Sequence, residues 1–188
     1  MRRLSFHPTG ITGCVEIVAQ RADDLRGSFV KIFHEEVFGT AGLPVHFAEW
    51  YHTFSHKGVL RGLHFQTPPH EHGKLVWCLG GSVLDVGVDL RVGSPTFRRH
   101  IAVSLTAEKA NGLYLPPGLA HGYYVYSDGG ATMSYGTTTV FAEDCDAGVA
   151  WDSAGVDWGT GDPILSERDR DLPRLEDYVS PFAYEATP

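Results

Sequence analysis

The sequence has few cysteines, no excess of positive charge and no long apolar run. Its three cysteines, Cys14, Cys78 and Cys145, are widely spaced and form no CxxC pair, which argues against a disulfide framework or a cysteine-based zinc site. Lys and Arg total 15 against 23 Asp and Glu, a formal net charge of −8. We therefore expect neither nucleic acid nor an anionic membrane as a partner. No apolar stretch approaches the roughly 20 residues of a membrane-spanning helix.

The first ten residues, MRRLSFHPTG, contain two arginines without a long apolar run behind them, so we expect no signal peptide. Together with the reduced cysteines, this predicts a cytoplasmic protein. A chain of 188 residues suits one domain, 1–188, with a substantial core.

Glycine and proline are abundant, with 22 and 11 copies, and they punctuate short apolar runs that are typical of strands. These runs are CVEIVAQ, GSFVKIF, HFAEWYHTFS, GVLRGLHF, KLVWCLG, SVLDVGVDL, HIAVSL, GLYLPP, HGYYVYS and ATMSYGTTTVF. Gly80, Gly81 and Ser82 predict a tight hairpin between residues 76–79 and 83–90. Such a strand-rich pattern predicts a mostly β fold, a sandwich or a barrel.

Helix signals are few. HEEVFGTAG predicts one turn of helix, and TAEKANG predicts another that ends at Gly112. From about residue 152 the chain is rich in Asp, Pro and Gly, which predicts an extended segment. A short helix is expected at 166–170, with Ser166 as its N-cap.

The stretch GVLRGLHFQTPPHEHGK, residues 58–74, is the most informative part of the chain. It places Arg61, His64 and Lys74 among apolar residues that belong in a buried sheet. Cations are costly there unless they meet a partner, so this stretch predicts a site that holds an anion and moves protons. Other parts of the chain supply residues that such a site needs: His121 in PPGLAHG, Tyr135 in MSYGTT and Asp169 in ILSERDRD.

The spacing of His70 and His72, with His121 later, raises the alternative of a metal site. The positions where a ligating Glu is expected, 75–77, are instead Leu, Val and Trp. Side chains that alternate in direction would not aim His70, Glu71 and His72 at one point. Because these histidines follow two prolines, we expect them in a solvent-exposed loop, and metal binding is a minor hypothesis.

A Pro-Pro-Gly turn that aims His121 into a barrel resembles the paired motifs of cupin folds. The motifs GVLRGLHFQ, GKLVW, SVLDVGVDLRxGSPTF, LYLPPGLAHGY, GVAWD and PILSERD extend this likeness in order along the chain, from residue 24 to about 173. Together they resemble the dTDP-4-dehydrorhamnose 3,5-epimerases and the related epimerases of deoxysugar pathways. The resemblance implies a cupin-like jelly-roll (a double-stranded β-helix), a homodimer, a nucleotide-sugar substrate, and neither metal nor cofactor.

The resemblance also implies a catalytic set. His64 matches the general base, Asp169 its acidic partner, Tyr135 the acid across the sugar ring, and Lys74 the lysine near the substrate carbonyl. Taken singly, each of these residues is more often a packing or surface residue. Their joint occurrence in this order favours the catalytic interpretation.

Further residues match the family's substrate contacts. Arg61 and Arg26 match arginines that hold the pyrophosphate, and His121 matches a second pocket histidine. Phe29 matches an aromatic that meets the nucleobase, contributed in the family by the neighbouring subunit. The remaining candidates for substrate contact are Glu49, Tyr51, Gln66 and Arg168.

These residue types suit the chemistry. A ketone at C4 of a hexose acidifies the hydrogens on C3 and C5, and an imidazole is a suitable base near neutral pH. Lys74 can stabilise the enolate charge more than the neutral ketone. Tyr135 can supply a proton to the opposite face, and arginines can grip a pyrophosphate in bidentate fashion.

The chain also departs from the family pattern. Glu49 and Tyr51 stand where a Gln and an Asn are usual, and 136–141 lacks the usual Lys and paired tyrosines. These changes leave the sugar, the reacting carbon and the nucleotide open, with dTDP the default and GDP or CDP as alternatives. Asp85 and Asp89 share one strand face, and we expect buried structural acids paired with an arginine or a histidine.

Other functions compete with the epimerase hypothesis. They are a mono-epimerase on a modified sugar, a keto-sugar ketoisomerase, a sugar-nucleotide binding module without catalysis, and a metal-dependent cupin oxygenase. Retention of the whole catalytic set argues against the binding module, and the missing Glu argues against the oxygenase.

Overall fold

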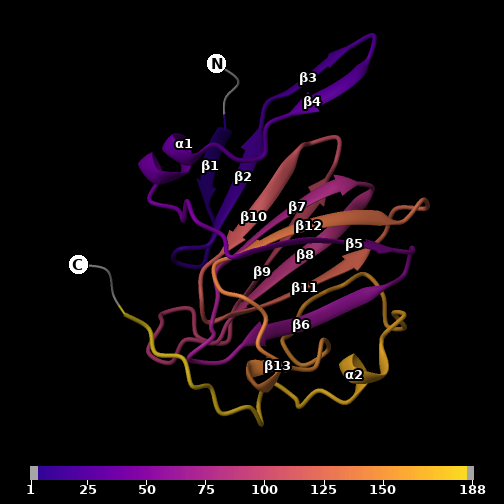
Figure 1. Cartoon of the computed structure of the whole chain (residues 1–188). Coiled ribbons are helices and arrows are strands. Elements are labelled where there is room, and N and C mark those ends of the chain that lie inside the picture. Colours follow the sequence, from indigo (N-terminus) through magenta and orange to yellow (C-terminus); the bar gives the residue numbers. More distant parts are fainter. Residues whose placement is uncertain (1–3, 186–188) are drawn as a thin grey trace.

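Two antiparallel sheets dominate the computed structural model, which describes residues 4–185 (Figure 1). The six-stranded sheet has the spatial order β1 (Leu4–Pro8), β2 (Val15–Ala19), β10 (Asn111–Leu115), β7 (Lys74–Gly80), β12 (Ala131–Thr137) and β5 (Glu49–Ser55). The five-stranded sheet has the order β13 (Asp146–Gly148), β6 (Leu60–Gln66), β11 (Leu119–Val125), β8 (Ser82–Asp89) and β9 (His100–Thr106). The mostly β class predicted from the sequence is confirmed.

The two sheets pack face to face. Side chains at alternating positions of both sheets, such as Val83, Val125, Leu113 and Met133, form one buried cluster between them. This alternation is what a strand produces when one of its faces is buried. Two antiparallel sheets whose consecutive strands repeatedly cross between them form a jelly-roll.

The outer face of each sheet is also covered. Phe38 of α1 (Glu35–Thr40) packs with Leu75 and Trp77 on the six-stranded sheet. The C-terminal segment places Trp158 and other apolar residues against the five-stranded sheet. Both sheets therefore bury residues on two sides, which explains why so many strands read as nearly continuous apolar runs.

The predicted hairpin at 80–82 is wrong. β7 and β8 flank Gly81 as expected, but they belong to different sheets and do not pair with each other. Gly81 has a φ of 78°, and a Cβ built on it would lie 2.1 Å from the carbonyl oxygen of Gly130. A glycine here turns the chain from one sheet to the other in very little space.

The remaining elements are short. The predicted helices at 35–40 and 167–170 are present as α1 and α2 (Glu167–Arg170), with a 3-10 turn η1 (Glu143–Cys145) between them. The predicted helix in TAEKANG is wrong, because only a turn separates β9 from β10. The Asn111 side chain closes this turn by accepting from the Thr106 amide. Within residues 4–185, no helix has the length and apolar character needed to cross a bilayer.

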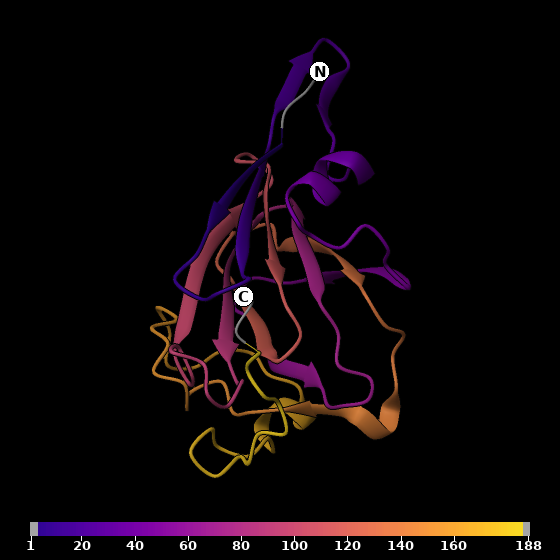
Figure 2. The same ribbon diagram turned by 90° about the vertical axis from the view of Figure 1, so that its left-hand side faces the viewer.

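A two-stranded hairpin, β3 (Arg21–Asp24) and β4 (Gly27–Val30), projects from the body of the molecule (Figures 1 and 2). Its tip is exposed, and Leu25 and Phe29 are among the exposed large apolar residues. The hairpin therefore offers apolar surface away from both sheets.

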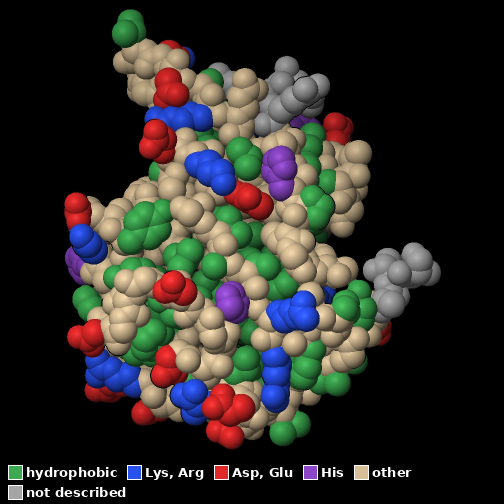
Figure 3. Space-filling model, turned by 180° about the vertical axis from the view of Figure 1, so that it is seen from behind, with side chains coloured by type: hydrophobic (Ala, Val, Ile, Leu, Met, Phe, Trp, Pro, Cys, Tyr) green, Lys and Arg blue, Asp and Glu red, His purple; other side chains and the backbone are tan. Residues whose placement is uncertain are grey.

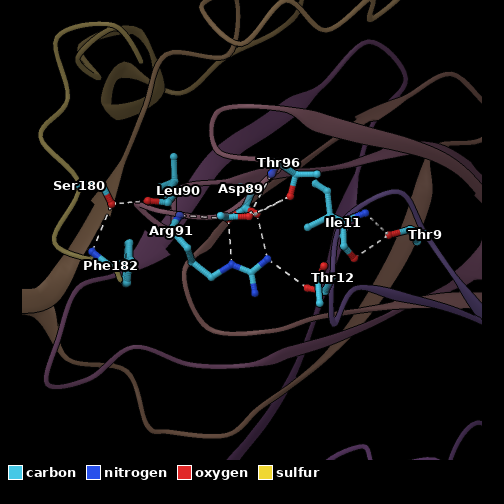
Figure 4. A network of polar contacts seen from close by, with 10 residues as sticks. Thr9, Ile11, Thr12, Asp89, Leu90, Arg91, Thr96, Ser180 and Phe182 are labelled. Atoms are coloured by element: carbon cyan, nitrogen blue, oxygen red, sulfur yellow. Dashed lines mark hydrogen bonds and ion pairs between the residues drawn. The ribbon is translucent and has the colours of Figure 1, made fainter. Parts of the chain in front are cut away.

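Asp89 at the end of β8 accepts hydrogen bonds from the segment that follows this strand (Figure 4). Its carboxylate accepts two hydrogen bonds of 2.9 Å from the Arg91 guanidinium and one of 2.7 Å from Thr96. Arg91 also donates to the carbonyl of Thr12 in the loop between β1 and β2. Burial raises the pKa of Asp89, but these hydrogen bonds outweigh it, so the pKa is lowered. The expected buried acid paired with an arginine is confirmed.

Candidate active site

β6 and β11 approach each other closely at two glycines. A Cβ on Gly62 would lie 2.5 Å from the Cα of Gly122, and Gly62 has a φ of 131°. His64 lies opposite His121 in this pairing, and the register shifts directly after His121. The irregular pairing sets two histidines side by side in the middle of the five-stranded sheet.

A cavity of about 220 Å³ opens at this point. Side chains from both sheets and from α2 line it: Tyr51, Thr53, Arg61, His64, Lys74, His121, Tyr123, Tyr135 and Arg168. Larger cavities of about 370 Å³ and 470 Å³ lie elsewhere, but no histidine lines either of them. The chemistry of its lining, rather than its size, identifies this cavity as the candidate site.

His64 and Asp169 form a hydrogen-bonded pair, 2.5 Å between Nε2 and Oδ1. α2 positions the carboxylate, because the Ser166 side chain caps this helix by accepting from the Asp169 amide at 3.1 Å. Burial raises the pKa of Asp169, but the hydrogen bonds from His64 and Ser166 and the charges of His64 and Arg168 together outweigh it, so the pKa is lowered. With Nε2–H directed at the carboxylate, Nδ1 of His64 is the nitrogen that can take up a proton.

His121 forms a second pair with Asp85. Its Nε2 lies 2.9 Å and 3.1 Å from the two carboxylate oxygens, and both residues are buried. Burial lowers the pKa of His121, although Asp85 opposes this effect. The expected pairing of a buried Asp85 with a histidine is confirmed.

Lys74 begins β7 and reaches the same cavity while almost fully buried. Burial lowers the pKa of its ammonium to about 8, and the nearby carboxylates of Asp85 and Asp146 oppose the shift. The side chain therefore stays mostly charged at neutral pH. A buried ammonium of this kind can stabilise negative charge that develops on a neighbouring oxygen.

Tyr135 is held between two other rings. It stacks on Tyr51 with ring centroids 4.7 Å apart at 17°, and it meets His121 edge-on at 6.1 Å. Burial raises the pKa of Tyr135 well above its ordinary value, so the phenol is protonated at neutral pH. Burial likewise raises the pKa of Tyr51 to about 12.

The two cavity arginines have partners of their own. Arg61 donates from Nε to Ser55 Oγ at 2.9 Å, and Arg168 pairs with Asp146 at 2.7 Å. Glu49 does not line the cavity; its carboxylate accepts from the Phe141 amide at 3.1 Å.

Gln66 is a further residue that we expected to contact the substrate. It is buried outside the cavity lining, and its Nε2 lies 2.8 Å from the His70 carbonyl and 3.1 Å from Nδ1 of His72. Its Oε1 accepts from the Ala142 amide at 2.6 Å. The amide group thus ties the loop before β7 to the segment after β12.

The expectation that His70 and His72 are exposed to solvent is wrong. His70 and His72 lie in a loop, as predicted, but both are half-buried rather than solvent-exposed. Burial lowers the pKa of His72 to about 3, and Lys74 and His121 add to the shift. Across residues 4–185, no group of three or more His, Cys, Asp and Glu side chains has an arrangement that could hold a metal ion.

Arg26 and Phe29 lie on the projecting hairpin and not around the cavity. Arg26 is fully exposed and pairs with Asp24 through Nε and Nη2. Of the two arginines matched to the pyrophosphate, only Arg61 therefore lines the cavity of its own chain.

Sequence reasoning missed two cavity residues, Thr53 and Tyr123. Thr53 had a usable signal, because Tyr51, Thr53 and Ser55 occupy alternate positions of β5 and so share one face. Tyr123 had none, because HGYYVYS contains three tyrosines and their orientations depend on the register after His121.

A jelly-roll with a His–Asp pair, a buried lysine and a phenol around one cavity is a fold and site suited to proton transfer next to a carbonyl. A family model described as dTDP-4-dehydrorhamnose 3,5-epimerase matches residues 8–177. The chain belongs to this family of sugar epimerases, which are isomerases.

Individual relatives support this family assignment. A dTDP-4-dehydrorhamnose 3,5-epimerase from Shigella flexneri is 42% identical over 78% of this chain and 82% of that protein. A dTDP-4-dehydrorhamnose 3-epimerase from Streptomyces niveus is 37% identical over 89% and 82%. The crystal structure of a dTDP-6-deoxy-D-glucose-3,5-epimerase from Legionella pneumophila, in complex with dTDP-4-keto-L-rhamnose, has a TM-score of 0.92 at 31% identity and covers 98% and 100% of the two chains.

Proposed function

We propose that this protein epimerises a nucleotide-linked 4-keto-6-deoxyhexose at C3, C5 or both, with dTDP as the preferred nucleotide and without a cofactor. One observation carries the proposal: His64, Lys74 and Tyr135 line one small cavity, and Asp169 is hydrogen-bonded to His64 behind it. The substrates in the names of the relatives support the sugar class.

The mechanism begins at His64. Its Nδ1 takes the proton from the carbon next to the C4 ketone, and Asp169 stabilises the resulting imidazolium. The electron pair of the broken C–H bond moves to the ketone oxygen, where the Lys74 ammonium stabilises the enolate. Tyr135 then gives its proton to the other face of the carbon, which inverts the centre. To complete the cycle, His64 releases its proton to solvent and Tyr135 regains one.

Two arginines at the cavity, Arg61 and Arg168, are suited to bind the pyrophosphate. This local charge does not depend on the charge of the whole chain, which is −8. On the face in Figure 3, Lys and Arg are interspersed with Asp and Glu instead of forming one broad basic patch. The pyrophosphate is remote from the reacting carbon, and its binding energy would position the sugar ring.

Solvent deuterium incorporation tests the function. The protein is incubated with dTDP-4-keto-6-deoxyglucose in heavy water, and the sugar is followed by mass spectrometry and proton NMR. We expect deuterium at C3, C5 or both, with inversion at each labelled carbon, and unchanged rates after treatment with a chelator. No incorporation with any of the dTDP, GDP or CDP sugars would overturn the proposal, and migration of the carbonyl would indicate a ketoisomerase.

We further propose a cytoplasmic homodimer of one-domain subunits. Arg26 and Phe29 lie on a hairpin that projects away from the body, so any substrate they contact is bound by a neighbouring copy (Figure 2). Exposed Trp50 and Phe54 on the edge strand β5 offer further apolar surface for association. Light scattering should give twice the chain mass. Arg26→Ala should raise KM with little change in kcat, whereas a monomer with full activity would contradict the dimer.

A further inference from the structure

A chain of hydroxyl groups leads away from Tyr135 behind the cavity wall. The Tyr123 hydroxyl lies 3.0 Å from Thr53 Oγ1 and 3.0 Å from Ser55 Oγ. Burial raises the pKa of the Tyr135 phenol and its contact with Tyr123 adds to this, whereas its contact with Thr53 lowers the pKa. Tyr123 and Ser55 are each only 2% exposed, so these contacts are shielded from bulk water.

The direction of these hydrogen bonds is fixed at one end. Arg61 Nε donates to Ser55 Oγ at 2.9 Å, and a guanidinium can only donate. Ser55 can therefore direct its own hydrogen at the Tyr123 oxygen. Tyr123, having accepted, directs its hydrogen at Thr53 Oγ1, and Thr53 can direct its own hydrogen at Tyr135. A cation at one end thus polarises the hydroxyl chain toward the phenol at the other.

This direction matters once Tyr135 has given up its proton. The phenolate that remains is buried, and an unsolvated anion is costly unless donors face it. A donor from Thr53 would form a charge-assisted hydrogen bond to that phenolate, which is stronger than one to the neutral phenol. It would therefore favour proton donation by Tyr135.

We propose that Tyr123 is a positioning residue for Tyr135: held by Ser55 and Arg61, it orients the Thr53 hydroxyl as a donor to the phenolate left when Tyr135 protonates the substrate. This inference rests on the proposed role of Tyr135 as the acid. The proton balance is complete without a further reactant. Solvent supplies a proton to the phenolate by way of Thr53, which lines the cavity, and the proton that His64 took from the substrate returns to solvent.

The test uses Tyr123→Phe, which keeps the ring and removes only the hydroxyl. If donation by Tyr135 is slowed, the enolate lives longer and His64 returns a solvent-derived proton to the original face. In heavy water we expect the ratio of deuterium exchange with retention to inversion to rise roughly tenfold and kcat to fall about as much, the effect of losing about 1.4 kcal/mol of transition-state stabilisation. KM should change less than about twofold, because uniform binding is not affected.

Matched variants separate this role from a structural one. Tyr124→Phe removes the neighbouring hydroxyl, which lines a different cavity, and should behave as wild type. Ser55→Ala should shift the exchange ratio in the same direction as Tyr123→Phe, and Ser55→Thr should restore it. These Ser55 variants also serve if Tyr123→Phe folds poorly, and melting temperatures are recorded for all.

The outcomes are distinct. A Tyr123→Phe protein with a wild-type exchange ratio and kcat overturns the inference, as does an equal fall in exchange and inversion. Tyr135→Phe tests the proposed function separately. If that variant still inverts the sugar, Tyr135 is not the acid. If it only exchanges deuterium without inversion while Tyr123→Phe remains wild type, the proposed function stands and only the role of Tyr123 is wrong.

Discussion

The two histidine–aspartate pairs of this protein have the same chemistry in different surroundings. His64 is 25% exposed at its side chain, and its partner comes from α2 in the C-terminal segment. His121 is 5% exposed, and its partner Asp85 is fully buried on the neighbouring strand β8. Only the first imidazole combines contact with the cavity and access to solvent.

Exposure to solvent therefore decides what such a pair can do. A base must exchange its proton with water in each cycle, which His64 can do. Burial lowers the pKa of His121 and favours its neutral form, so this ring is suited to hold Asp85 near Lys74 and to pack against Tyr135. We infer that one pair moves protons and that the other maintains the electrostatics and shape of the cavity.

The largest expected effect separates the pairs by activity. His64→Asn should lower kcat by roughly 10²- to 10⁴-fold, the usual contribution of a general base. The free energy of unfolding of this variant should change by no more than about 1 kcal/mol, because the His64 side chain is partly exposed. Turnover assays and urea unfolding measure both quantities, with the exposed His52→Asn as the control. Activity close to wild type in the His64 variant would remove the base from the mechanism.

The second prediction concerns stability. His121→Leu leaves the Asp85 carboxylate buried without its partner, which should lower the free energy of unfolding by roughly 3 kcal/mol. The double variant with Asp85→Leu should recover part of the loss, because no buried charge remains unpaired. Urea unfolding checks both. If the single variant is as stable as wild type, the inner pair is not structural.

The third change weakens the outer pair without removing the base. Asp169→Asn should lower kcat about thirtyfold, since a hydrogen bond to a charged group contributes roughly 2 kcal/mol. The loss should be smaller than that of the His64 variant. Asp171→Asn, an exposed neighbour, is the control in the same turnover assay. An effect as large as that of His64→Asn would mean that the carboxylate does more than stabilise the imidazolium.

The smallest effect is a pH dependence set by Lys74. Since burial lowers its pKa from 10.5 to about 8, the ammonium loses its charge above pH 8, and kcat should fall up to about tenfold per pH unit there. Between pH 8 and 10.5 the unfolded chain binds more protons than the folded one, so this group's contribution to stability rises with pH.

Lys74→Met should remove this rise in stability, whereas the surface variant Lys57→Met should retain it. Rate profiles from pH 6.5 to 10 and urea unfolding at pH 8 and pH 10 give the comparison. A kcat that stays constant through pH 9 would show that the positive charge on Lys74 is not needed.

Much of the fold followed from local pattern. The ten apolar runs all contain strands, and Ser166 caps α2 as predicted. The errors arose where pairing is decided over distance. Gly81 looks like a hairpin turn from its neighbours alone, but β7 and β8 have better partners in opposite sheets.

In the candidate site, too, some residues followed from the local sequence pattern and others depended on contacts between distant segments. His64, Lys74, Tyr135 and Asp169 were chosen by residue type and order, and the structure places the first three around one cavity with Asp169 behind His64. Gln66 belongs to the same motif as His64, but its side-chain amide forms hydrogen bonds with the backbone of two loops. No local sequence pattern reveals these partners.

The strands, the buried cations and the proton-transfer set follow from the amino-acid sequence, because period-two patterning, turn residues and the cost of burying charge act locally. Folding in three dimensions decides which histidine reaches solvent, which tyrosine hydroxyl joins Thr53 and Ser55, and that Arg26 does not line the cavity of its own chain. These features depend on sheet pairing and on the register shift after His121, where one residue of slip changes which side chain enters the site.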